Sequence, residues 1–109
     1  MAICYVAHKS GGDPYNIKVA KKITHDLQTN DLQNTYICPL LALSHLGYKE
    51  IGRDEEMELR LDILSVCDVL VVASEVSDGV QMEIDFAHLV GMEVIYLEEE
   101  YGSVQSVKV

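Results

Sequence analysis

The chain has 109 residues, 49% of them hydrophobic and 24% charged, with a formal net charge of −10. This composition is typical of one globular domain, which we place over residues 1–109, and the negative charge argues against a protein that binds nucleic acid through a basic surface. The N-terminus has no signal-peptide pattern and no apolar run is long enough to span a bilayer, so we expect no membrane association.

The first half of the chain predicts two strands and a helix. Ile3–Ala7 is a short apolar run typical of a strand. Asp13-Pro14 is a favourable helix start, and apolar residues then recur at helical spacing until the polar stretch Gln28–Gln33. Thr35–Cys38 is predicted to be a second strand that ends before Pro39.

The second half continues the alternation. The predicted elements are a helix from about Asp54 to Val66, a strand at Val69–Ser74, a helix from Ser77-Asp78-Gly79 to about Val90, and a strand at Met92–Leu97. The last dozen residues form either an edge element or a loose tail. This order predicts an α/β fold with a small doubly wound parallel sheet of about four to five strands, flavodoxin-like and three-layered (α/β/α).

The three cysteines are isolated and lie at or beside apolar runs. Cys4, Cys38 and Cys67 have neither CxxC spacing nor a surrounding cluster of His and Cys, so we expect no metal, no disulfide and no cofactor. Buried reduced thiols fit a cytoplasmic location.

Glu83 is the residue that departs from the amphipathic pattern. The apolar residues of the helix after Ser77 spread over an arc of roughly 220°, and Glu83 lies inside that arc. A carboxylate there requires a hydrogen bond or a charged partner. Two explanations remain open: a functional group in the crevice, or an acid that caps the helix, which would require Val80 to be the N-cap.

The loop His8–Asp13 is a second candidate, because a Ser-Gly-Gly turn before a helix offers backbone N–H groups to an anion. Ser77-Asp78-Gly79 forms a similar donor cluster at the next helix start. His45 and Tyr48 are weaker candidates for contact with a nucleobase, in a segment (residues 40–53) whose structure the pattern does not define.

These features resemble the nucleoside 2-deoxyribosyltransferase-like superfamily, including its nucleoside-monophosphate N-glycosidase branch and related small phage and bacterial domains. The resemblance covers about Ala2 to Leu97. Its most specific part is S-D-G-V-Q-M-E-I, Ser77 to Ile84, which is similar to the family's S-x-G-x-x-x-E turn.

The resemblance implies that Glu83 is the nucleophile and that Tyr5, in I-C-Y-V-A, orients it. It also implies that the loop from His8 holds the nucleotide and that Ser77 and Gly79 help to hold a 5′-phosphate. The residues expected to bind substrate or phosphate are His8, Lys9, Ser10, Gly11, Gly12, Arg60, Ser77, Asp78 and Gly79.

One position departs from the family pattern. The aspartate that protonates the leaving base in the glycosidase branch corresponds to Arg60 here, with Glu58 and Asp62 two residues away on either side. Two residues on a helix are about 200° apart, so Asp62 is the catalytic acid only if the helix register differs. Arg60 instead favours phosphate binding without turnover.

The sequence therefore supports an N-glycosidase or deoxyribosyltransferase that acts on a nucleoside or nucleoside monophosphate. The alternative is a non-catalytic nucleotide-binding protein that senses or sequesters a nucleotide signal, and a third is an interaction module that keeps the fold without a ligand. The resemblance also implies a homodimer, which the extended apolar surface of the third helix suits. The base, the sugar and the occurrence of turnover are left open.

Overall fold

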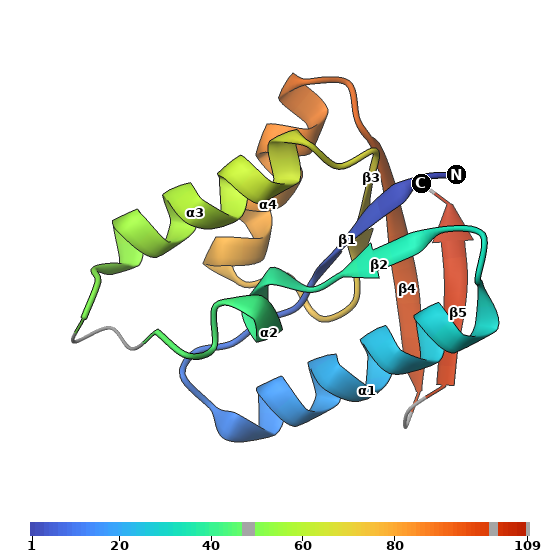
Figure 1. Ribbon diagram of the computed structural model, residues 1–109, viewed down its shortest axis with the longest axis horizontal. Helices are drawn as coiled ribbons and strands as arrows, with labels where there is room; N and C mark the ends of the chain where they lie inside the picture. Colours follow the sequence, from blue (N-terminus) through green and yellow to red (C-terminus); the bar gives the residue numbers. More distant parts are fainter. Residues whose placement is uncertain (47–49, 101–102, 109) are drawn as a thin grey trace.

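The computed structural model describes residues 1–46, 50–100 and 103–108, with side chains up to residue 97. These residues form one five-stranded sheet in the order β2-β1-β3-β4-β5 (Figure 1). The strands are β1 (Ile3–Ala7), β2 (Thr35–Ile37), β3 (Val69–Val72), β4 (Glu93–Glu100) and β5 (Ser103–Lys108). The first four are parallel and β5 is antiparallel to β4. The doubly wound fold is confirmed, and the final residues form an edge strand.

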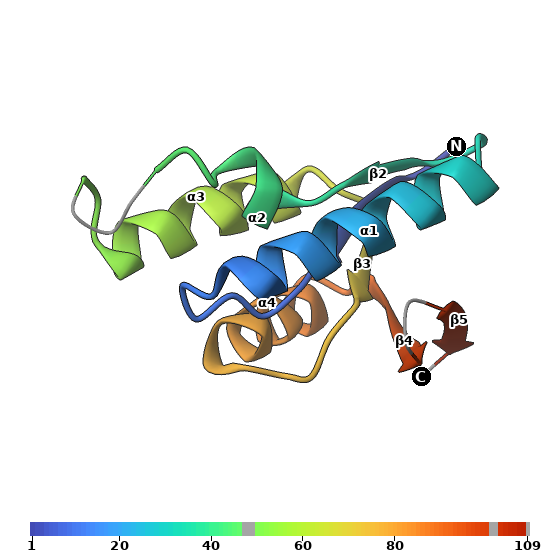
Figure 2. The ribbon, with the colours of Figure 1, turned by 90° about the horizontal axis from the view of Figure 1, so that it is seen from below.

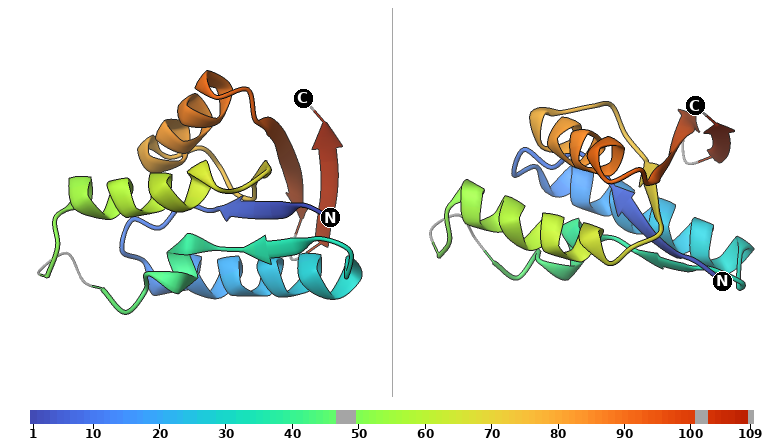
Figure 3. Two further views of the ribbon diagram at one scale, coloured as in Figure 1. Left: turned by 45° about the horizontal axis from the view of Figure 1, so that its top comes forward. Right: turned by 90° about the horizontal axis from the view of Figure 1, so that it is seen from above.

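Four helices complete three layers. They are α1 (Pro14–Asn30), α2 (Pro39–Ala42), α3 (Arg53–Ser65) and α4 (Asp78–Leu89). Helices α1 and α2 pack on one face of the sheet, whereas α3 and α4 pack on the other (Figures 2 and 3). Strand β2 lies on one side of β1, and β3, the next strand along the chain, lies on the other side. The strand order therefore reverses between β1 and β3. In folds of this type, ligands bind beyond the carboxyl ends of the strands at that point.

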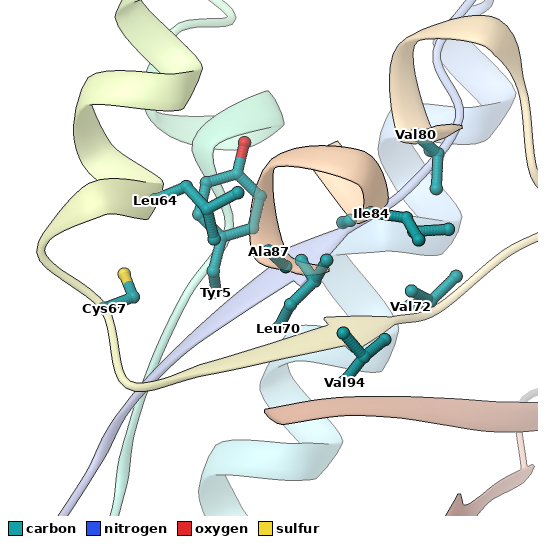
Figure 4. Close-up of a cluster of buried hydrophobic side chains, with 10 residues drawn as sticks. Tyr5, Leu64, Cys67, Leu70, Val72, Val80, Ile84, Ala87 and Val94 are labelled. Carbon is teal, nitrogen blue, oxygen red and sulfur yellow. The ribbon is translucent and has the colours of Figure 1, made fainter. Parts of the chain in front are cut away.

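Successive side chains along each strand point to opposite faces of the sheet, so a hydrophobic core forms on each face. In β1, Tyr5 points towards α3 and α4, whereas Val6 points towards α1. In the β3 segment, Leu70 belongs to the α3/α4 side and Ala73 to the α1 side. Figure 4 shows the larger cluster, in which the Tyr5 ring lies beside apolar side chains from both helices. This arrangement explains why β3 is a continuous apolar run, since both of its faces are covered.

The segment between residues 39 and 53 was the least predictable part of the chain. Pro39 begins the short helix α2, and Cys38, predicted as the end of a strand, is the N-cap of that helix. Helix α3 begins one residue earlier than predicted, because the Glu55 carboxylate accepts a hydrogen bond from the Gly52 N–H at 2.9 Å and so fixes the start. Tyr48 lies outside the described residues.

Within the described ranges, no helix combines the length and the apolar character that a bilayer crossing requires.

Replacement of Leu70 by Ala should destabilise the fold strongly, because Leu70 is completely buried in the central strand β3. We expect a loss of about 2–5 kcal/mol in the free energy of unfolding from removed contacts and the remaining cavity. Leu32→Ala is the matched control, since that leucine is 83% exposed between α1 and β2, and it should change the free energy by less than about 0.5 kcal/mol. Urea denaturation followed by circular dichroism measures both, and equal effects would contradict this core assignment.

Candidate functional site

Two loops meet at the sheet edge where β1 and β3 end. Residues 8–13 follow β1, and residues 73–77 follow β3 (Figure 1). The Ala73 N–H donates to the Ala7 carbonyl at 2.8 Å, and the Lys9 N–H donates to the Ser74 Oγ at 2.8 Å. These bonds hold the two loops together, so most of the predicted site residues belong to one region of the molecule.

The β1–α1 loop is a tight turn in which two backbone N–H groups donate to an atom of the loop itself. Gly11 and Gly12 have φ values of 57° and 76°, a conformation that glycine adopts without steric cost. The N–H groups of Gly12 and Asp13 donate to Ser10, at Oγ and the carbonyl oxygen respectively. The Asp13 carboxylate caps α1 by accepting from the Tyr15 N–H at 2.9 Å. The loop therefore already places a carboxylate at the start of α1.

The position of the α4 N-cap shows whether Glu83 can cap this helix. Ser77 is the N-cap, and its Oγ accepts a hydrogen bond from the Val80 N–H at 3.3 Å. Glu83 consequently lies in the second turn of the helix, too far along to cap it, which excludes the capping explanation. Asp78 and Gly79 occupy the first two helical positions, and Met57 of α3 packs closely against Gly79.

Glu83 is buried in the α3/α4 side of the core, with only 1% of its surface exposed. The Tyr5 hydroxyl, equally buried, donates a hydrogen bond to Oε2 of Glu83. The other oxygen, Oε1, is buried and has no hydrogen-bond partner among the described residues. Burial raises the pKa of Glu83, whereas the bond from Tyr5 and the positive charge of Arg60 act in the opposite direction. Burial and the negative charge of Glu83 raise the pKa of Tyr5.

Arg60 lies in the core beside this pair rather than at the surface. It is 6% exposed, and its Nη2 forms an ion pair with Oε1 of Glu56 at 3.2 Å. Its Nε is buried without a hydrogen-bond partner in the described part of the chain. Burial alone lowers the pKa of Arg60, but the negative charges of Glu56 and Glu83 outweigh it and the pKa is raised. Tyr5, Glu83, Arg60 and Glu56 thus form one buried polar group, which we call the carboxylate cluster.

Glu56 is a member of the cluster that reasoning from the sequence missed, because the acidic run Asp54–Glu58 has the pattern of a solvated face. Three of the run's acids do face solvent, but the Glu56 side chain is only 13% exposed. The available signal was the i,i+4 spacing of Glu56 and Arg60, which places the two side chains together on one helix face.

Asp62 and His8 occupy different surroundings from those of the cluster. Asp62 lies on the exposed face of α3 and is not brought to Glu83. His8 is 3% exposed at the end of β1, with Nδ1 2.7 Å from the carbonyl oxygen of Lys9. The Lys9 ammonium pairs with Glu75 at 3.5 Å.

Two concave regions lie near this sheet edge, and residues of α1 line part of each. The loop hollow has a volume of about 170 Å³ and is lined by Ser10, Gly12, Ile17, Leu40, Leu43, Ser44, Leu46 and Glu56. The larger α1 groove is lined by His8, Lys9, Tyr15, Asn16, Lys18, Val19, Lys21, Lys22, Ile23, His25, Ser74, Glu75 and Leu97. Glu56 is the member of the carboxylate cluster that lines the loop hollow, and no member of the cluster lines the α1 groove.

Within the described residues, no group of three or more His, Cys, Asp or Glu side chains is placed to hold a metal ion. The three cysteines are buried with free thiols. A scan against protein-family models finds no match to this chain, and a search of curated proteins finds no significant similarity.

Glu83→Gln should change how stability depends on pH, because the pKa of Glu83 is raised in the folded protein above its ordinary value of 4.5. A carboxyl of this kind stabilises the fold fully below its unfolded pKa, and the contribution is lost as pH rises through the folded pKa. The wild type should therefore lose stability relative to Glu83→Gln as pH rises above about 4.5.

Urea denaturation at several pH values between about 4 and about 8 measures this difference. The matched control is Glu58→Gln, which removes a carboxylate from the exposed face of α3. A difference between wild type and Glu83→Gln that stays constant with pH would show that Glu83 is not held in a buried, apolar environment.

Proposed function

We propose that this protein is an N-glycosidase or a deoxyribosyltransferase-like enzyme that acts on a nucleoside or nucleoside monophosphate, with Glu83 as the nucleophile. The observation that carries the proposal is the burial of the Glu83 carboxylate against the Tyr5 hydroxyl, next to the loops that end β1 and β3. A buried carboxylate with one oriented oxygen and one unpartnered oxygen is an arrangement that enzymes use for nucleophilic attack at an anomeric carbon.

The two carboxylate oxygens of Glu83 have separate roles in this proposal. Oε2 accepts the hydrogen bond from Tyr5, which fixes the angle of the carboxylate. Oε1, which has no partner among the described residues, attacks the anomeric carbon as the bond to the base breaks, giving a glycosyl-enzyme ester. Water then hydrolyses the ester in a glycosidase, or a second base takes the sugar in a transferase.

The departing base takes the electron pair of the glycosidic bond and needs a proton or a positive charge nearby. Asp62 faces solvent, so it is not placed to supply the proton. Arg60 keeps its proton at neutral pH, but its guanidinium stabilises negative charge that develops beside Glu83. This favours bases that leave readily as anions or that receive a proton from water.

Access to Glu83 requires movement at the loop hollow. The hollow is smaller than the roughly 300–1,000 Å³ of common ligand pockets, so in this structure it has room for part of a nucleoside. The Glu56–Arg60 ion pair lies between the hollow and Glu83, because Glu56 lines the former and Arg60 interacts electrostatically with the latter. Displacement of this pair is the step that connects the hollow to the nucleophile.

The proposal also includes a cytoplasmic location and a homodimeric assembly. Free buried thiols suit a reducing cytoplasm. A homodimer is supported by the exposed apolar surface of Met82 and Leu89 on α4 and of Val90, which follows the helix.

The test is release of free base from a panel of nucleosides and their 5′-monophosphates, followed by liquid chromatography. Glu83→Ala should abolish release, because no other carboxylate in the described structure takes its place beside Tyr5. Tyr5→Phe should reduce the rate by about 10–100-fold, since it removes orientation but leaves the nucleophile. Folding of each variant is checked by circular dichroism. A panel with no base released by the wild type, or release that persists in Glu83→Ala, would contradict the proposal.

The second candidate is a non-catalytic nucleotide-binding protein, and the α1 groove is the observation that favours it. Four of the chain's eight Lys and Arg residues line this groove, against Glu75 as its lining carboxylate. Val19, Ile23 and Leu97 give it an apolar floor on which a base can lie. A phosphorylated ligand bound there would be recovered intact, since Glu83 does not line the groove.

For this candidate, the double variant Lys18→Gln/Lys22→Gln should weaken binding of a nucleoside triphosphate by about tenfold or more, because two attractive charges are removed. Isothermal titration calorimetry measures the affinity, and mass spectrometry of the recovered ligand shows whether it is intact. Lys18→Arg/Lys22→Arg keeps the charges and should bind like the wild type. Unchanged affinity in the glutamine variant would exclude the groove as the binding site.

A further inference from the structure

The loop hollow carries a negative charge at the point where it meets the carboxylate cluster. Its lining consists of apolar side chains, Ser10, Gly12, Ser44 and one carboxylate, Glu56, and includes neither Lys nor Arg. A phosphate in this hollow would therefore face a fixed carboxylate without a cation from the lining to balance it. Repulsion between two such charges is large where water is partly excluded.

Arg60 does not supply the missing cation, because its charge is already engaged. Its Nη2 is 3.2 Å from Glu56, and it also interacts with the charge of Glu83. Two carboxylates and one guanidinium leave this group with no excess positive charge. A phosphate that recruited Arg60 would leave Glu56 unpaired, and breaking a buried ion pair in this way is strongly unfavourable.

The helix starts at this edge already carry a capping side chain of the protein itself, Asp13 at α1 and Ser77 at α4. Asp13 caps α1 by accepting from the Tyr15 N–H. At α4, Ser77 accepts from Val80 and Asp78 occupies the first helical position. A carboxylate at a helix N-terminus takes the place that a phosphate would otherwise take, since both are favoured by the same N–H groups and dipole.

Three backbone donors of the β1–α1 loop are used within the protein. The N–H groups of Lys9, Gly12 and Asp13 donate to Ser74 or Ser10. The ammonium group of Lys9 pairs with Glu75 and lines the α1 groove. The positive charge of Lys9 thus belongs to a different concave surface from the loop hollow.

From this juxtaposition we infer that Glu56 is a specificity-determining residue, which admits an uncharged nucleoside to the loop hollow and excludes the corresponding 5′-monophosphate. The inference rests on the proposed function and narrows its substrate class. Glu56 keeps one face open to the hollow, where its carboxylate accepts hydrogen bonds from the hydroxyl groups of a sugar. The same carboxylate repels a phosphate that would replace one of those hydroxyls.

The test compares a nucleoside with its own 5′-monophosphate in two measurements on the intact chain. Base release gives the ratio of kcat/KM for the two ligands, and heteronuclear NMR titration follows the amide signals of Ser10, Gly12 and Ser44, which line the hollow. We expect the wild type to prefer the nucleoside by about tenfold or more in both measurements.

Glu56→Gln should reduce this preference to near unity while the nucleoside still binds, because Gln keeps an oxygen that accepts hydrogen bonds from Arg60 and from the ligand. Glu58→Gln is the matched control. It removes one carboxylate from the exposed face of the same helix, so the preference should remain as in the wild type. Circular dichroism verifies that both variants are folded.

The outcomes separate this inference from the proposed function. Base release without a preference for the nucleoside, or a preference that survives in Glu56→Gln, overturns the inference and leaves the glycosidase proposal standing. Selective shifts of the hollow amides by the nucleoside with no base released support the inference and count against catalysis. If the monophosphate shifts these amides as strongly as the nucleoside, or neither ligand shifts them, the inference is wrong.

Discussion

The carboxylate of Glu83 is held inside the hydrophobic core by a hydrogen bond from Tyr5, and much of the neighbouring structure compensates for that burial. An ionised group in an apolar interior requires charges and donors around it. Arg60 provides the charge, and Glu56 in turn balances Arg60. The cluster therefore connects β1, α3 and α4 on one face of the sheet. It lies next to β1, at which the strand order reverses.

Such a cluster is difficult to explain by stability alone. Replacing buried ion pairs by apolar residues of similar volume is often neutral or stabilising, so the Glu56–Arg60 pair is weak evidence of a stabilising role. Glu83 Oε1 and Arg60 Nε are buried and lack hydrogen-bond partners among the described residues, which is an uncommon state for polar atoms in a folded protein. This incomplete set of partners lies near the sheet edge where folds of this type bind ligands, which is the observation that motivates the proposed function.

The same sheet edge has two different electrostatic surroundings. On the side of α3 and α4, the buried cluster holds two carboxyl groups and one guanidinium, whereas the groove along α1 is lined by half of the chain's Lys and Arg residues. The sheet separates these regions, so a ligand that suits one is poorly matched to the other. Ligand charge is therefore the property that best distinguishes a glycosidase acting at Glu83 from a nucleotide-binding protein that uses the α1 groove.

The sequence by itself determined the fold class, the order of the parallel strands along the chain and the burial of Glu83. It could do so because apolar periodicity, Pro and Asp at helix starts, and one acid inside an apolar arc are local signals. Only the tertiary structure decided that Arg60 points into the core, that Glu56 rather than Asp62 accompanies it, and that the last residues pair with β4 as an edge strand. These features depend on which helix face meets the sheet and on contacts between residues far apart in the chain, and local patterns of spacing and charge do not specify either of them.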